Sequence, residues 1–83
     1  MRVRMTTVYR DWFDGLRDHV ARARIQVRVD RLVHGNLGAH RALREGVSEL
    51  KIDVGPGYRV YFTERGGDKA TQRRDIERAQ NLP

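Results

Sequence analysis

Apolar and polar positions follow a helical period in the first part of this chain. After a weak alternation over residues 2–7, which suits a short strand, apolar side chains recur at i, i+3, i+4 and i+7: Tyr9, Trp12, Phe13 and Leu16. This spacing predicts a helix with one core-facing side. A second helix is predicted from a cap at Asp18 to a stop at Gly35. Its apolar stripe consists of Ala21, Ile25, Val29 and Leu32.

The period changes to two in the second half of the chain, as expected for half-buried strands. Apolar residues at 50, 52 and 54 alternate with polar ones, and the alternation resumes at 58, 60 and 62 beyond the turn Gly55-Pro56-Gly57. Two such segments joined by a tight turn predict an antiparallel hairpin. Its inner face, which we expect to pack on the helices, carries Leu50, Ile52, Val54, Tyr58, Val60 and Phe62.

The segments that flank this hairpin carry weaker signals. Residues 34–46 contain several glycines and are predicted to form a loop. A short C-terminal helix containing Ile76 and Ala79 is predicted beyond Gly66-Gly67. Residues 1–83 are therefore expected to form one α+β domain: an N-terminal strand, a helical hairpin, an antiparallel sheet packed on the helices and a short final helix. The predicted core is Trp12, Phe13, Leu16, Ile25, Val29, Leu32, Leu50, Ile52, Val60 and Phe62.

The charge balance of the chain is strongly basic. Lys and Arg number 17 against 11 Asp and Glu, the net charge is +6, and only Lys51 and Lys69 are lysines. Arginine pairs with phosphate through a planar fork, so the composition favours a polyanionic partner such as RNA, DNA, the ribosome or an acidic protein. The chain has no Cys, its His residues lack ligand spacing, and no apolar run is long enough to span a membrane. We expect no metal, no other cofactor, no membrane partner and a cytoplasmic location.

The solvent side of the predicted hairpin holds the candidate chemistry. Lys51, Arg59 and Tyr61 are expected to lie there together with Glu49. Cations beside an aromatic ring on an exposed sheet are typical of an RNA surface, because phosphates meet the cations and a base stacks on the ring. Cleavage of RNA without a metal needs a base, a cation for the charged phosphorane and an acid. On spacing alone, however, a Lys and an Arg on a strand are more often solubilising residues.

Three segments carry more specific motifs. They are Glu-Gly-Val-Ser-Glu-Leu-Lys-Ile over residues 45–52, Gly-Pro-Gly-Tyr-Arg-Val-Tyr-Phe over 55–62 and Gly-Asp-Lys-Ala-Thr-Gln over 67–72. Together with weaker matches within 12–36 and at 75–76, they make nearly the whole chain resemble the HigB-like branch of the RelE/ParE toxin superfamily. The resemblance implies the toxin of a type II toxin–antitoxin system. Many such toxins are ribosome-dependent mRNA endonucleases, held inactive by a cognate antitoxin that is usually a helix-turn-helix protein.

The resemblance also implies a set of site residues. Lys51, Arg59 and Lys69 match positions where relatives place basic residues and would act on the scissile phosphate as catalytic residues. Further RNA-binding candidates are Arg24, Arg28, Arg31, Tyr61 and Arg73. The three arginines between 24 and 31 form a stripe that faces phosphate or an antitoxin, or is simply a solvated helix face. Glu49 stands where relatives carry a second strand Lys, and their C-terminal Tyr has no counterpart.

The chain departs from the superfamily in one further respect. Relatives carry an additional strand between the Tyr-Phe-Thr segment and the Gly-Gly-Asp-Lys segment, which are nearly contiguous here. Its absence predicts a shortened sheet with an unpaired edge beside residues 58–63. Through this edge the chain would form a homo-oligomer or bind its antitoxin, unless residues 2–7 pair there. Three functions therefore remain open: an mRNA endonuclease, an inactive remnant that binds its antitoxin or itself, and a non-catalytic inhibitor of DNA gyrase.

Overall fold

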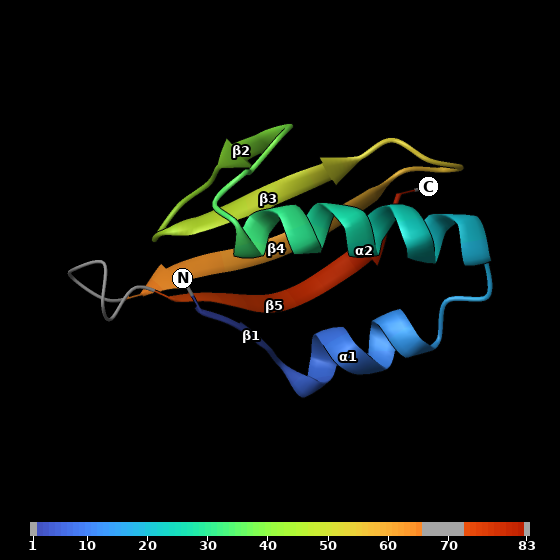
Figure 1. Ribbon diagram of the computed structural model, residues 1–83, viewed down its shortest axis with the longest axis horizontal. Coiled ribbons are helices and arrows are strands. Elements are labelled where there is room, and N and C mark those ends of the chain that lie inside the picture. Colours follow the sequence, from blue (N-terminus) through green and yellow to red (C-terminus); the bar gives the residue numbers. More distant parts are fainter. Residues whose placement is uncertain (1, 66–72, 83) are drawn as a thin grey trace.

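The computed structural model describes residues 2–65 and 73–82, and over this part the chain forms a five-stranded sheet with two helices (Figure 1). The strand order is β1-β5-β4-β3-β2, in which β1 pairs in parallel with β5 and all other neighbours are antiparallel. The predicted α+β fold is confirmed. In chain order the elements are β1 Arg2–Met5, α1 Thr7–Asp14, α2 His19–Val33, β2 His40–Ala42, β3 Val47–Ile52, β4 Tyr58–Arg65 and β5 Arg73–Asn81.

Side-chain caps begin both helices of the helical hairpin. Thr6 Oγ1 accepts a hydrogen bond from the backbone N–H of Tyr9 at 3.1 Å. Asp18 Oδ1, the cap expected from the sequence, accepts two N–H groups from the first turn of α2 at 3.0 and 3.1 Å. These contacts satisfy donors that a helix start leaves without an intrahelical partner. Neither helix in the described part of the chain is long and apolar enough to cross a membrane.

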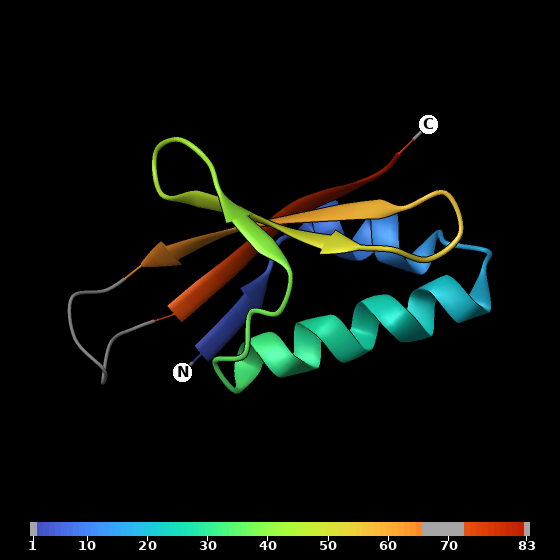
Figure 2. The same cartoon turned by 90° about the horizontal axis from the view of Figure 1, so that it is seen from above.

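Both helices cover the same face of the sheet, which we call the helix face (Figures 1 and 2). α2 lies across it, whereas α1 lies beside β5 beyond the end of β1. Seven of the ten predicted core residues are buried here. Trp12 and Phe13 of α1, and Leu16 just after it, are only partly buried because this part of the chain lies at the margin. The core cluster consists of Tyr9, Ala21, Ile25, Val29, Leu32, Leu50, Ile52, Tyr58, Val60, Phe62 and Ile76.

The C-terminal segment is a strand, so the predicted C-terminal helix is wrong. β5 pairs antiparallel with β4 along its whole length, with one bulge. Its first inward-facing residues are Arg74 and Ile76, which are 8% and 0% exposed. The guanidinium of Arg74 lies 2.8 Å from the carboxylate of Glu64 and donates a hydrogen bond to the carbonyl of Leu32 at 3.2 Å. An arginine at an inward position hides the apolar alternation by which a strand is recognised.

The edge of β4 beside residues 58–63 is occupied, so the expectation of a free edge is wrong. β5 pairs with one side of β4 and β3 with the other. Association of the chain through that edge therefore loses its basis. Residues 2–7 do not pair there either, since β1 pairs with β5. The segment predicted as a loop also contains a short strand, β2, which pairs with β3 at the other side of the sheet.

Candidate functional site

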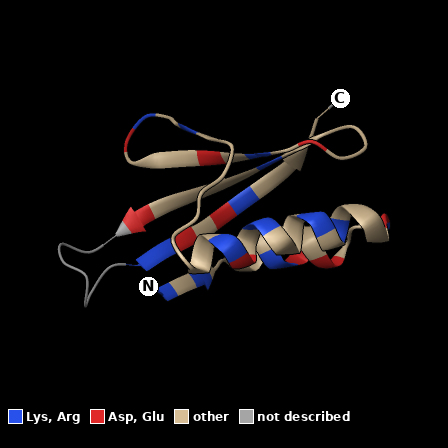
Figure 3. Ribbon diagram, turned by 45° about the horizontal axis from the view of Figure 1, so that its top comes forward, with Lys and Arg blue, Asp and Glu red and all other residues tan. Residues whose placement is uncertain are grey.

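The face of the sheet opposite the helices, which we call the open face, collects charged side chains from neighbouring strands. β5 carries both arginines and acidic residues (Figure 3). The strand register places the outward residues of β2, β3, β4 and β5 side by side near the centre of this face. The resulting open-face cluster consists of Arg41, Glu49, Lys51, Arg59, Tyr61, Arg78 and Gln80.

Lys51 and Arg59 lie directly opposite each other on β3 and β4. Directly opposed residues of an antiparallel pair have Cβ atoms about 4.5–5.5 Å apart, so one phosphate can meet both cations. Like charges in this position destabilise a sheet by up to about 1 kcal/mol. An anion between the two side chains would offset that cost. Two of the three residues predicted as catalytic from the sequence, Lys51 and Arg59, are thus brought together.

Glu49 is the acidic centre of the cluster. Its side chain is only 4% exposed, and Oε1 lies 3.2 Å from Arg41 Nη2 and 3.7 Å from Arg59 Nε. The buried carboxylate holds two guanidinium groups near the Lys51 position and offsets part of their repulsion. Arg41 was not expected here, because β2 was not recognised as a strand.

Tyr61 is covered by side chains from β5, although the sequence placed its ring on the solvent side. The ring is on the open face but only 8% exposed. The guanidinium of Arg78 lies 4.4 Å from its centroid, and the amide of Gln80 donates a hydrogen bond to its hydroxyl at 2.9 Å. A base can stack on this ring only by displacing Arg78. Arg78, which is exposed, offers its own guanidinium plane for stacking instead.

Arg73, another candidate, does not join the cluster. Arg73 lies opposite residue 65 of β4. Residue 65 is six residues along the strand from Arg59, so the backbones of Arg73 and Arg59 are about 20 Å apart at the usual strand rise. Its guanidinium pairs with Asp75 at 3.2 Å. Lys69 lies outside the described residues. Within residues 2–65 and 73–82, no group of three or more His, Asp and Glu side chains is arranged to hold a metal ion.

Arg28 was predicted to bind RNA, but its guanidinium is engaged in hydrogen bonds within the protein. Its guanidinium donates hydrogen bonds to the carbonyl oxygens of Leu37 at 2.9 Å, Ala39 at 2.7 Å and Lys51. Burial, with the neighbouring charge of Arg31, lowers the pKa of Arg28, and Asp53 opposes the shift. Arg28 therefore ties α2 to β3 and to the segment that follows the helix, and it is not free to meet phosphate.

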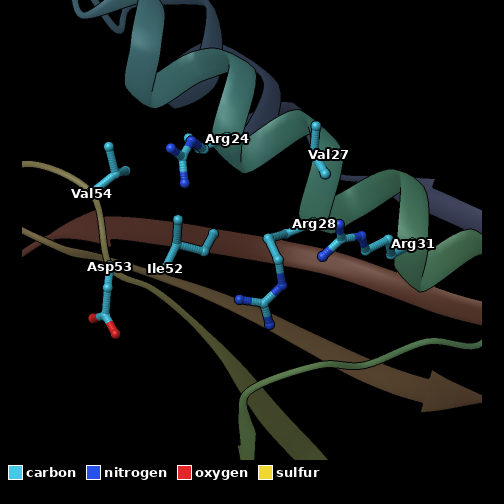
Figure 4. Close-up of a pocket in the computed structure, with 7 residues that line it drawn as sticks. All are labelled: Arg24, Val27, Arg28, Arg31, Ile52, Asp53 and Val54. Carbon is cyan, nitrogen blue, oxygen red and sulfur yellow. The ribbon is translucent and has the colours of Figure 1, made fainter.

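Arg24 and Arg31 flank Arg28 on α2 and line a groove of about 390 Å³ between the helix and the end of β3 (Figure 4). This α2 groove lies on the helix side of the sheet, whereas Lys51 and Arg59 point to the open face. The structure therefore separates the arginine stripe from the predicted catalytic pair. The groove is lined by Arg24, Val27, Arg28, Arg31, Ile52, Asp53 and Val54.

One relative covers almost the entire chain. A protein from Haemophilus influenzae, described as uncharacterized, is 36% identical over 91 aligned residues, which include 99% of this chain and 92% of the relative. The chain belongs to the family of this protein. Because the alignment is longer than the 83 residues of the chain, the family member from H. influenzae carries residues with no counterpart here. No protein-family model and no solved structure matches the chain.

Proposed function

We propose that this chain is the toxin of a type II toxin–antitoxin system of the RelE/ParE kind and that it cleaves mRNA on the ribosome. The observation that carries the proposal is the direct cross-strand pairing of Lys51 with Arg59 on the open face. The cluster also supplies Arg41 and Arg78, which extend the positive surface on either side. The sequence motifs around these residues, which resemble that superfamily, supply the rest of the argument.

The chemistry of the proposed reaction uses positive charge rather than a cofactor. The ribose 2′-oxygen loses its proton and attacks the adjacent phosphorus, and the bond from phosphorus to the 5′-oxygen breaks. The 5′-oxygen takes up a proton, leaving a 2′,3′-cyclic phosphate and a 5′-hydroxyl. Lys51 and Arg59 stabilise the additional negative charge of the phosphorane between these two events. Lys69 is the third cation assigned to this phosphate by the motif resemblance.

The proposal includes a cytoplasmic location and a cognate antitoxin of the helix-turn-helix kind. The antitoxin is not needed to complete the sheet, since β4 is paired on both sides. The alternative of a shortened, inactive remnant rested on an incomplete sheet. The pairing of β4 with β3 and β5 removes that support. The pairing of β4 therefore supports an intact toxin domain over a shortened remnant.

The test compares mRNA cleavage by variants of the purified protein on translating ribosomes. Arg59→Ala should slow mRNA cleavage by about a hundredfold or more, the usual effect of removing one charge-stabilising donor. Lys51→Ala should have a similar effect, and the double variant should be little worse than either single one if the two act as a unit. Arg10→Ala, which removes one charge from an exposed position on α1, is the matched control and should cleave normally.

Mapping of mRNA 5′ ends is the readout, with thermal unfolding to show that each variant is folded. Cleavage by folded Arg59→Ala at the wild-type rate would remove the catalytic role of the open face. If the wild-type protein arrests growth but does not cleave mRNA, the nuclease proposal is contradicted and inhibition of DNA gyrase is favoured. Absence of both cleavage and growth arrest would leave the inactive remnant.

A further inference from the structure

The α2 groove combines apolar lining residues with positively charged side chains that have no partner among the described residues. Val27 is 45% exposed at its rim, and Ile52 and Val54 form the wall contributed by β3 and the turn that follows. Arg24 and Arg31 are exposed, and within the described residues their side chains have no hydrogen bond or ion pair. In Figure 4 both extend from α2 on either side of Arg28. The groove is therefore amphipathic, and its charges are available to a partner.

The walls of this groove are held in place before anything binds. Arg28 fixes α2 to the carbonyl of Lys51, the residue before Ile52, and to two carbonyls of the segment after the helix. A partner would thus meet a preformed surface and would not have to order it, which reduces the cost of association. None of the residues that line the groove belongs to the open-face cluster.

The lining of the groove is poorly suited to RNA. It contains no aromatic ring on which a base could stack. The valine and isoleucine side chains offer nothing to a sugar–phosphate backbone. A second copy of this chain is also disfavoured, because each copy carries a net charge of +6.

We propose that the α2 groove is a docking site for an acidic, amphipathic polypeptide segment of a partner protein. An apolar side chain of that segment lies over Val27 and Val54, and carboxylates on either side of it pair with Arg24 and Arg31. Asp53 accepts a backbone N–H of the bound segment. The inference does not rest on RNA cleavage, since it concerns a different surface of the molecule.

The test selects peptides from a displayed library of random dodecapeptides against the wild-type protein. We expect selected sequences in which Asp or Glu residues flank Leu, Ile, Val or Phe. Methyl NMR signals of Val27, Ile52 and Val54 should shift when such a peptide is added. The double variant Arg24→Glu/Arg31→Glu should bind it at least about tenfold more weakly, because two ion pairs become repulsions. A peptide with its acidic residues replaced by Lys should bind this variant better than it binds the wild type.

The control variant is Arg10→Glu/Arg44→Glu, which changes the net charge equally at exposed positions away from the groove. It should bind the selected peptide as the wild type does. Equal losses in both double variants would show a general charge effect and overturn the proposal. So would a selection without an acidic-apolar consensus, or peptides that leave the three methyl signals unchanged. If a single-stranded oligouridine shifted those signals instead, the groove would be an RNA site and the proposal would be wrong.

Discussion

Arg28→Ala is the substitution that most directly tests how the helix side of the molecule is held together. One guanidinium serves three backbone carbonyls, two of them on the segment between α2 and β2 and one on β3. Hydrogen bonds from charged donors contribute more than neutral ones, and loss of the donor leaves the acceptors to be satisfied by water. Two of the three bonds are partly buried and one is exposed, so they are not equivalent.

Allowing for this partial exposure, we expect Arg28→Ala to reduce the free energy of unfolding by about 2–3 kcal/mol. For a domain of this size that corresponds to a decrease of roughly 10–20 °C in the melting temperature. Arg28→Lys should lose less, because an ammonium group can still reach one of the carbonyls. Chemical denaturation and calorimetry measure both quantities.

Arg24→Ala is the matched control, since it removes the same side chain one turn earlier on α2 at an exposed position without a partner in the described part of the chain. Its effect should stay within about 0.5 kcal/mol. Hydrogen exchange adds a local readout: the amide of Lys51, which donates to Ala39 O at 3.1 Å, should lose protection in Arg28→Ala. Equal stabilities for the Arg24 and Arg28 variants would refute the reasoning.

Three further outcomes are expected. Burial raises the pKa of Tyr9 from 10.0 to about 12, so the free energy of unfolding should fall as the pH rises between these values, because the unfolded chain loses that proton first. Tyr9→Phe should abolish this pH dependence and leave stability at neutral pH equal or higher, since the buried hydroxyl has no partner among the described residues. Gly38→Ala should destabilise more than Gly35→Ala: both glycines have positive φ, but only at Gly38 would a Cβ approach the Arg28 side chain, at 3.1 Å. Finally, RNA binding measured by fluorescence anisotropy should weaken with salt, with roughly −0.7 added to the log–log slope per phosphate contacted, and a flat dependence would exclude the open-face cations as the contacts.

The helical hairpin and the β3–β4 hairpin could be predicted because each is specified by neighbouring residues. The Asp18 cap, the stripe from Ala21 to Leu32 and the Gly55-Pro56-Gly57 turn are local signals, and the structure contains all of them. The position of Lys51 opposite Arg59 followed from the same local register. What the alternation could not show was the covering of Tyr61, because its cover comes from a different part of the chain.

β5 and β2 were missed for the opposite reason, since long-range contacts determine both. The inward position of Arg74 is stabilised by Glu64 and by a carbonyl of α2, and no pattern within residues 73–81 indicates either contact. β2 is exposed throughout and pairs with β3 alone, so it carries no apolar periodicity. Arg41 and Arg78 reach the open face on these two strands. The residues of the candidate site that the sequence did not reveal are therefore those that arrive on strands with atypical patterns.

β5 connects the stability of the fold to the integrity of the candidate site. It lies between β4 and β1 in the sheet, and its two faces serve different purposes. Ile76 on the helix face is fully buried in the core, while Arg78 and Gln80 on the open face cover Tyr61. These contacts join residues that are far apart in the sequence, so they form only when the sheet closes. A substitution that loosens the core side of β5 would therefore disturb the open face without touching it, and loss of activity assigns a residue to the site only when the stability of that variant is unchanged.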